Sequence, residues 1–383
     1  MKSTMKKIQP SSRRGFLKLF LAAAGTLLVT PLLKACQYFD VAQPTQQSSE
    51  MTNTFIPSEP ASQTPELVKK TSTPAQVMDT DVTSIAFVKT RDRETGVRQA
   101  LELLGINPIQ GKSVLLKPNF NSADTAPASS HPLTIRSLVT SLQSLGATKI
   151  TLADRSGMGH SRDVMQKLGM FDLANLLGFD TLSFEDLVNE SDWELIDLPG
   201  SHWQNGFPFA RPALEAGAVV QTCCLKPHRF GGHFTLSLKN TIGLVGKFRG
   251  AGGYNYMTEL HNSPYQRLMI AEANQAYTPA LILLDGVDAF INQGPDIGTQ
   301  IAGDLIMAGT DRIAIDVFAL AVLRLLGLSG EAARGSIFGQ EQIARAVELE
   351  LGITSPDKIR IITNDPASQA YADQIMAVLI RDG

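Results

Sequence analysis

The chain has 383 residues, of which 43% are hydrophobic, which is enough for one large α/β domain or two smaller ones. The formal net charge of -3 hides an asymmetry: residues 1–35 carry seven of the 34 Lys and Arg and none of the 37 acidic residues, so the remainder has a net charge of -10. So acidic a domain is a poor nucleic-acid binder, although a local basic pocket is compatible with it. The three Cys lack C-x-x-C spacing, which excludes a zinc ribbon and a four-Cys iron–sulfur cluster.

Residues 1–36 have the pattern of an export signal. The basic stretch "SRRGFLK" is followed by residues 19–33, which are mostly apolar and fall short of the roughly 20 residues that span a bilayer. The paired Arg13 and Arg14 resemble a twin-arginine signal, which implies the twin-arginine export machinery as a partner and a periplasmic or other extracytoplasmic location. "LKAC" resembles a bacterial lipobox, which would make Cys36 the lipidated first residue and anchor the protein to a membrane; Lys34 departs from the usual small or aliphatic residue.

Residues 37–81 form a predicted tether. They are rich in Pro, Ser, Thr and Gln, as in "QPTQQSSE" and "PSEPASQTP", and show no apolar periodicity. Such a segment buries too little surface to offset its ordering entropy, so we expect a disordered linker between a membrane and residues 82–383.

Short apolar strands alternate with amphipathic helices through residues 82–383. The expected strands are 82–88, 114–117, 149–153, 218–225, 280–284, 305–308 and 358–362. The expected helices are 91–105, 133–146, 163–169, 171–178, 264–277, 311–326 and 340–351. This alternation predicts a single large α/β domain in which a mostly parallel sheet carries helices on both faces.

Charged residues close four of the expected strands, namely Lys117, Asp154, Lys226 and Asp285. Lys117 and Lys226 each precede Pro, which holds the preceding residue extended and offers no hydrogen-bond donor. Ligands of open parallel sheets bind at the carboxyl ends of the strands. One charge at a strand end is often only solvated, but four together, with His228, His233 and Lys239 close behind, favour a shared site.

The residue types at this predicted site fit anion binding, proton transfer or metal binding. The lysines could hold a carboxylate or phosphate, and a buried lysine could act as a base or form an imine. The histidines could move protons or bind metal, and the aspartates could complete a metal set or balance the lysine charges. The expected catalytic residues are Lys226, His228, His233 and Lys239. The expected ligands of a divalent metal are Asp154, His228, His233 and Asp285.

Several other residues have two readings. His131 precedes Pro132 and a helix start, where it could cap the helix or touch a ligand. We expect the other histidines to be structural, namely His160, His202 and His261. The Gly-rich run at 243–256 lacks the P-loop pattern and is predicted to be a mobile lid from which Arg249 contacts substrate. Cys223 and Cys224 are expected to be small buried hydrophobes because neighbours in a strand face opposite ways.

Five segments together are similar to the domain of unknown function 362 family: "VLLKPN", "LADRSG", "CLKPHRFGGHFTLSLKNTIGLVG", "LLDGVDAFINQGPDIG" and "MAGTDRIAIDVFAL". The resemblance covers roughly residues 82–326 and implies functional positions at Lys117, Asn119, Asp154, Lys226, His228, Lys239, Asn240, Asp285, Asp311 and Asp316. Of these, Lys117, Asn119 and Asn240, together with Arg249 of the predicted lid, are the expected substrate-binding residues. Some family members carry ferredoxin-type Cys clusters, which this chain lacks. More distantly, the His and Lys set resembles the nickel-pincer lactate racemase group.

Three functions are compatible with these patterns. The first is an exported enzyme, such as a racemase, isomerase or oxidoreductase, that acts on a small anionic substrate with or without a divalent metal. The second is a membrane-tethered protein that binds an anion or metal without catalysis. The third is a structural protein of the cell envelope whose polar sheet edge is only solvated.

Overall fold

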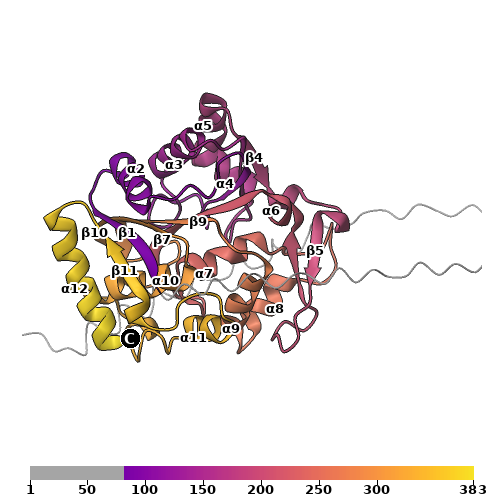
Figure 1. The fold of residues 1–383 in the computed structure, drawn as a ribbon. Coiled ribbons are helices and arrows are strands. Elements are labelled where there is room, and N and C mark those ends of the chain that lie inside the picture. Colours follow the sequence, from indigo (N-terminus) through magenta and orange to yellow (C-terminus); the bar gives the residue numbers. More distant parts are fainter. Residues whose placement is uncertain (1–81) are drawn as a thin grey trace, which may run out of the picture. The chain divides into compact units, whose positions relative to one another are not determined.

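The computed structural model describes residues 82–383, so the predicted export signal, Cys36 and the predicted tether lie outside the described residues. A nine-stranded sheet is the centre of this part of the chain (Figure 1), with the order β11-β1-β10-β9-β7-β2-β3-β4 and β8 paired to β7. The strands of this sheet are β1 (Thr83–Lys89), β2 (Ser113–Lys117), β3 (Lys149–Asp154), β4 (Asp180–Ser183), β7 (Ala218–His228), β8 (His233–Thr235), β9 (Leu281–Phe290), β10 (Gln300–Gly309) and β11 (Ile359–Ile362). A separate antiparallel pair consists of β5 (Trp193–Ile196) and β6 (Phe207–Ala210).

Most strand pairs of the large sheet are parallel. Strands β4, β3, β2, β7 and β9 run in one direction, and β1 and β11 are parallel to each other. The antiparallel pairs involve β10, which joins β9 to β1, and the short β8, which folds back on β7. The predicted α/β class with a mostly parallel sheet is therefore confirmed.

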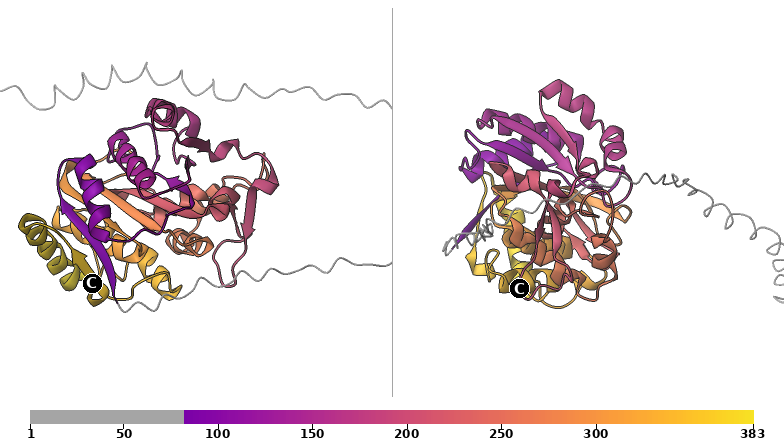
Figure 2. Two further views of the ribbon diagram at one scale, coloured as in Figure 1. Left: turned by 45° about the horizontal axis from the view of Figure 1, so that its top comes forward. Right: turned by 90° about the vertical axis from the view of Figure 1, so that its right-hand side faces the viewer.

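Helices cover both faces of the sheet, as Figures 1 and 2 show. One face carries α2 (Arg93–Leu104), α3 (Pro132–Ser144), α4 (Ser161–Lys167) and α5 (Met170–Leu177). The other carries α7 (Ser237–Asn240), α8 (Tyr256–Asn262), α9 (Gln266–Glu272), α10 (Arg312–Leu325), α11 (Glu341–Glu348) and α12 (Pro366–Asp382), while α6 (Arg211–Glu215) follows β6. Single 3₁₀ turns are η1 (Phe184–Asp186), η2 (Glu190–Asp192), η3 (Thr241–Leu244), η4 (Ala273–Ala276), η5 (Glu331–Ala333) and η6 (Pro356–Lys358).

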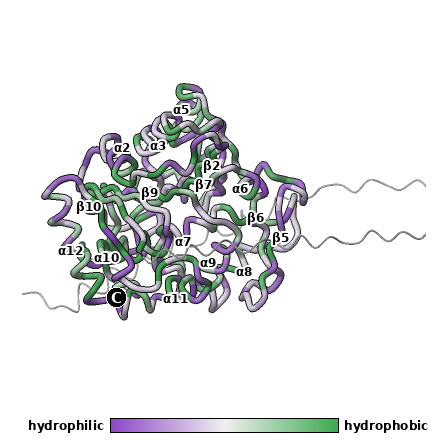
Figure 3. The backbone as a smooth tube through the Cα atoms, viewed as in Figure 1, coloured by the Kyte–Doolittle hydropathy of each residue, from purple (hydrophilic) through white to green (hydrophobic). Residues whose placement is uncertain are grey.

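Alternation along the strands explains the two-sided core. On β2, Leu116 packs with the α2–α5 layer and Leu115 packs on the opposite face, because successive strand residues point to opposite sides. Helix α10 is buried almost all round, as expected for a helix that is apolar on every side. Figure 3 shows the same concentration of hydrophobic residues in the strands and α10. Residues after Leu326 join the core of α10, so they do not form a separate lobe.

Two strands run further than the sequence predicts. Strand β7 continues past Lys226 and Pro227 to His228, because a hairpin with β8 pairs Lys226 with Thr235 and His228 with His233. Strand β9 continues past Asp285 to Phe290, where it pairs with β10. Lys226 and Asp285 therefore lie within strands, and the prediction that they close their strands is wrong. Within residues 82–383, no helix combines the length and apolar character needed to cross a bilayer.

Candidate functional site

A small pocket lies at the carboxyl ends of β2 and β3, where the sequence predicts a site. Its volume is about 60 Å³. The residues that line it are Lys117, Asn119, Phe120, Asn121, Asp154, Arg155, Gly157, His228, Thr235, Lys239, Asn240, Ile242 and Gly243. Strands β2, β3 and β7, the short helix α7 and the turn η3 all contribute to this lining.

A buried ion pair forms the floor of the pocket. Lys117 Nζ lies 2.8 Å from Asp154 Oδ1, and both side chains are almost fully buried. Burial raises the pKa of the Asp154 carboxyl and lowers the pKa of the Lys117 amine, while their mutual attraction acts in the opposite direction. A side chain at Gly243 would begin within 2.6 Å of Lys117 Nζ, so only glycine lets the η3 backbone close over this pair.

Two amides extend this floor. Asn240 Oδ1 accepts hydrogen bonds from Lys117 Nζ at 3.0 Å and from Asn119 Nδ2 at 3.1 Å. The Asn119 Oδ1 atom is buried and has no hydrogen-bond partner within residues 82–383. Leaving a buried acceptor without a hydrogen bond costs free energy. A bound group that donates a hydrogen bond to this oxygen would therefore be favoured.

Lys239 and His228 face the pocket without partners. Among the described residues, no hydrogen bond or ion pair involves the partly buried Lys239 amine, and the buried His228 Nδ1 has no hydrogen-bond partner. A side chain at Gly232 would begin 3.0 Å from both His228 Nδ1 and Lys239 Cδ, so the two side chains converge beside this glycine.

The electrostatic surroundings shift the pKa of both groups. Burial lowers the pKa of Lys239 to about 7, and the charges of Lys226 and Arg155 add to this effect. Burial also holds the pKa of His228 well below its usual value, with Lys239 as the next largest cause. These shifts favour the neutral form of His228 at pH 7 and let Lys239 release its proton at a lower pH than an exposed lysine does.

Arg155 is a pocket residue that the sequence prediction missed. Its guanidinium donates hydrogen bonds to the carbonyl oxygens of Val245 at 2.8 Å and Ile242 at 3.0 Å, which fixes the η3 turn over the pocket. The available signal was its position directly after Asp154 at a strand end. Three basic groups, Lys117, Arg155 and Lys239, thus surround one carboxylate, Asp154, so the pocket suits an anion.

Helix α7, which carries Lys239 and Asn240, is held from below by α10. The Asp316 carboxylate accepts hydrogen bonds from the backbone N–H groups of Ser237 at 2.7 Å and Leu238 at 3.0 Å. Burial raises the pKa of Asp316 to about 8, and these two bonds oppose that shift. They supply the partner that Asp316 requires inside an apolar helix, while Asp311 caps α10 through Ala314 N at 2.9 Å.

Four predicted site residues lie outside the pocket lining. Lys226 is buried and donates to the carbonyl oxygens of Ala128 and Pro295, the latter at 3.1 Å. Asp285 lies on the α2–α3 side, where it accepts from Arg93 Nε at 2.9 Å and Thr134 Oγ1 at 2.5 Å. His233 is partly exposed, and Arg267 and Glu341 are its charged neighbours. Arg249 lies in the loop after η3 and does not line the pocket.

This separation disagrees with the predicted metal site. Asp154 pairs with Lys117 and Asp285 pairs with Arg93, so neither aspartate joins His228 and His233, which are opposite each other in the β7–β8 hairpin. Among residues 82–383 there is no group of three or more His, Cys, Asp or Glu that could hold a metal ion. The predicted donor set of Asp154, His228, His233 and Asp285 therefore does not fit a divalent metal.

The remaining histidines and cysteines have structural surroundings. His131 caps α3 by accepting from Leu133 N at 3.1 Å, which decides between its two readings. His202 contacts Glu272 at 2.6 Å, and His261 contacts the carbonyl oxygen of Met257 at 2.7 Å. His160 Nδ1 lies 3.3 Å from Glu185. Both Cys223 and Cys224 are buried, as predicted.

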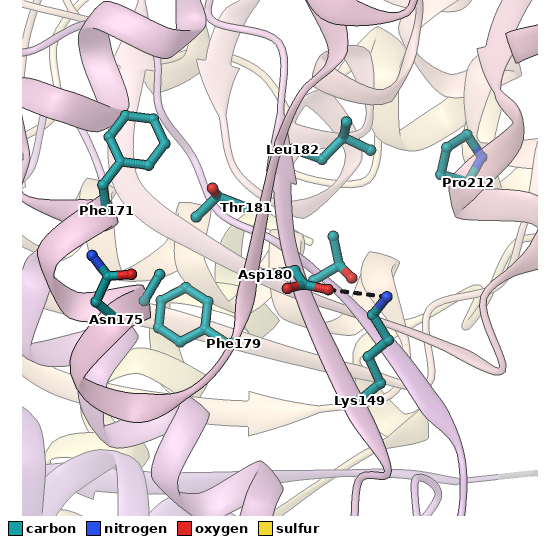
Figure 4. Close-up of a pocket in the computed structure, with 10 residues that line it drawn as sticks. Lys149, Phe171, Asn175, Phe179, Asp180, Thr181, Leu182 and Pro212 are labelled. Atoms are coloured by element: carbon teal, nitrogen blue, oxygen red, sulfur yellow. Dashed lines mark ion pairs between the residues drawn. The ribbon is translucent and has the colours of Figure 1, made fainter.

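A larger hollow, shown in Figure 4, lies beside β3, β4 and α5. Its volume is about 700 Å³, and aromatic side chains of Phe171 and Phe179 line one side of it. Its ionic residues pair with each other, since Lys149 Nζ lies 2.9 Å from Asp180 Oδ2 and both side chains are exposed. We therefore assign the candidate site to the smaller pocket, where a basic group has no partner.

Comparison with known proteins identifies the family. Residues 114–321 match the family described as "Domain of unknown function (DUF362)", which is more than half of the chain and includes every residue that lines the pocket. The chain belongs to the DUF362 family. The resemblance seen in the sequence is thus confirmed, and the pocket lies within the part of the chain that defines the family.

Two individual proteins are similar to this DUF362 chain. The thylakoid-associated protein sll1697 of Synechocystis sp. is 25% identical over 257 residues, which cover 64% of this chain and 75% of that protein. Among solved structures, the lactate racemase apoprotein from Thermoanaerobacterium thermosaccharolyticum is 14% identical with a TM-score of 0.38, over 77% of this chain and 86% of that chain.

Proposed function

We propose that this DUF362 protein is an enzyme that binds a small carboxylate in the pocket and transfers a proton to or from it. The observation that carries the proposal is the Lys239 amine, which has no counter-ion among the described residues and lies beside the unpartnered His228 Nδ1. A partly buried amine without a counter-ion is an unfavourable arrangement in the free protein, and an anionic ligand would relieve it.

The size of the pocket favours a small anionic group. Ligand pockets for drug-sized molecules measure roughly 300–1,000 Å³, whereas this pocket measures about 60 Å³. A carboxylate fits that space, and Lys239 could donate to it. Asn119 Oδ1 could accept a hydrogen bond from a neighbouring hydroxyl or amine of the ligand.

The two unpartnered groups also suit acid–base chemistry. A group with a pKa close to the working pH is the most effective proton donor or acceptor, and the pKa of Lys239 is about 7. The neutral His228 imidazole can accept a proton at the same place. The Lys117–Asp154 pair and Asn240 would hold the ligand floor in position, since they are already bonded to one another.

Calorimetric titration with formate, acetate and phosphate tests the binding step. We expect acetate to bind the unmodified protein and the Lys247→Met control, whose lysine is exposed, but not Lys239→Met. Stronger binding of phosphate than of carboxylates would contradict the proposed substrate class. Equal affinity for acetate in all three proteins would mean that the anion does not bind at Lys239.

Exchange of the hydrogen next to the carboxylate with D₂O tests the chemical step. Nuclear magnetic resonance of small carboxylates should show exchange that requires both His228 and Lys239. Binding without exchange across such a series would favour the second candidate, a membrane-tethered anion-binding protein without catalysis.

We further propose that the protein is exported through the twin-arginine route and held at a membrane. The paired Arg13 and Arg14, the apolar residues 19–33 and the lipobox-like Cys36 support this proposal. The name of the Synechocystis relative, a thylakoid-associated protein, is compatible with a location at a membrane.

A further inference from the structure

We propose that the carboxylate bound in the pocket carries an apolar substituent, which lies across a rim made by Phe230 and Met158. This inference rests on the proposed function and narrows its substrate class. It comes from two exposed hydrophobic side chains that adjoin the pocket in different loops, Phe230 at 46% exposure and Met158 at 39%.

Phe230 lies in the turn between β7 and β8. Its ring contacts the ring of the pocket residue His228 edge-on, with 5.8 Å between ring centres. The Arg229 guanidinium lies 4.2 Å from the centre of the Phe230 ring, and Arg229 itself is paired with Asp296 at 2.5 Å. The ring is therefore held beside the pocket by its neighbours while almost half of the residue remains exposed.

Met158 lies in the loop between β3 and α4. Its backbone N–H donates to the carbonyl oxygen of Asn121 at 2.7 Å, and its sulfur accepts from Asn121 Nδ2 at 3.5 Å. Asn121 and Gly157 both line the pocket, so Met158 adjoins it through a sequence neighbour and a hydrogen-bonded partner. The two apolar side chains therefore adjoin the pocket from separate parts of the chain.

The size and polarity of the pocket indicate which type of ligand substituent would contact Phe230 and Met158. The interior is polar and its volume is about 60 Å³. Any part of the ligand beyond a carboxylate and its nearest carbon must therefore extend out of the pocket, over Phe230 and Met158. A sugar or a phosphate ester would leave Phe230 and Met158 in contact with water or polar groups. An aliphatic or aromatic substituent would remove them from water, which is favourable in proportion to the area buried.

A series of straight-chain carboxylates tests the inference by calorimetry. Burial of one methylene group increases affinity by about fourfold, so affinity should rise from acetate to butanoate to hexanoate, and 4-hydroxybutanoate should bind more weakly than butanoate. In Phe230→Ser and Met158→Ser the increase per methylene should become smaller while acetate affinity stays unchanged. The control Leu176→Ser, at a 70% exposed position on α5, should behave like the unmodified protein.

The outcomes separate this inference from the proposed function. If acetate binds but affinity does not depend on chain length, or depends on it as strongly in the two rim variants as in the unmodified protein, the apolar substituent is wrong and the carboxylate pocket stands. If no carboxylate binds to the unmodified protein, both proposals are wrong.

Discussion

Lys239 shows how a single residue can favour binding at the cost of folding stability. Its amine is partly buried, has no counter-ion in the described part of the chain, and has a pKa lowered to about 7. Because the unfolded chain holds this proton more tightly than the folded one, the protonated Lys239 lowers the free energy of unfolding. This destabilisation is fully present below pH 7 and disappears as the pH rises toward the unfolded pKa of about 10.4.

Replacing this lysine should therefore make the protein more stable and less active. We expect Lys239→Met to raise the free energy of unfolding at pH 6 by about 1–2 kcal/mol, because a partly buried charge is replaced by an apolar group of similar length. The gain should shrink between pH 7 and pH 10. Urea unfolding at pH 6 and pH 9 measures it, and a variant that is less stable than the unmodified protein at pH 6 would show that Lys239 has a stabilising partner.

At the scale of elements, the link between α10 and α7 positions the pocket. Asp316 on α10 accepts the first two N–H groups of α7, the helix that presents Lys239 and Asn240. We expect Asp316→Asn to lose one of these bonds, since an amide nitrogen would face an N–H group. The variant should then lose about 1–3 kcal/mol of stability and much of its affinity for acetate.

Asp311→Asn provides the matched control for this prediction. Asp311 also accepts two backbone N–H groups, from Ala314 at 2.9 Å and Ile353 at 2.8 Å, but it does not contact α7. Its replacement should reduce stability to a similar degree and leave acetate affinity unchanged. Equal losses of affinity in both variants would mean that α7 is not positioned by Asp316.

The sequence predicts several apolar strands well, but it misses other elements, both short and long. Strands β1, β2, β3 and β11 begin and end within one residue of their predicted limits, because apolar runs between turn residues define them. The prediction missed β4, β5, β6 and β8, which have three or four residues each and too few side chains to show a period. It also missed α12, although its buried residues Ala372, Ile375 and Leu379 have helical spacing.

The sequence correctly predicts the edge of the sheet at which the site residues lie, but it does not predict the face of the sheet toward which each side chain points. Lys117 and Asp154 meet as expected, since both end neighbouring parallel strands. Asp285 lies opposite Cys224, and its side chain points toward α2 and α3 because it shares the face of the sheet that carries Leu283 and Val287. Which helices cover that face depends on contacts between distant segments, which one sequence does not display.

At the scale of the whole domain, the charged residues predicted as one site are divided between the pocket cluster of Lys117 and Asp154 and a second cluster that contains Asp285. Asp285 pairs with Arg93 and belongs to the α2–α3 side. We expect Asp285→Asn to lower stability by about 3 kcal/mol, because Arg93 is left with a buried charge that is only partly compensated. Acetate affinity measured at a temperature well below unfolding should not change. A loss of affinity would show that the two clusters act together.

The proposed export is a second prediction at the scale of the whole chain. Replacement of Arg13 and Arg14 by Lys should retain the protein in the cytoplasm if the twin-arginine route carries it. Cys36→Ser should release the exported protein from membranes if this residue is lipidated. Cell fractionation followed by immunoblotting measures both, and unchanged distribution of the paired-Lys variant would rule out this route.

Proton uptake on binding tests the central claim most directly. At pH 7.5 most Lys239 amines are neutral, since their pKa is about 7, and a carboxylate should draw a proton onto this group. Titration of acetate in buffers that differ in ionisation enthalpy should show uptake of roughly one proton or slightly less. Lys239→Arg, which is always charged, should bind acetate without proton uptake. Measurable proton uptake that is equal in both proteins, or unchanged acetate affinity in Lys239→Met, would contradict the assignment of Lys239 as the anion-binding group.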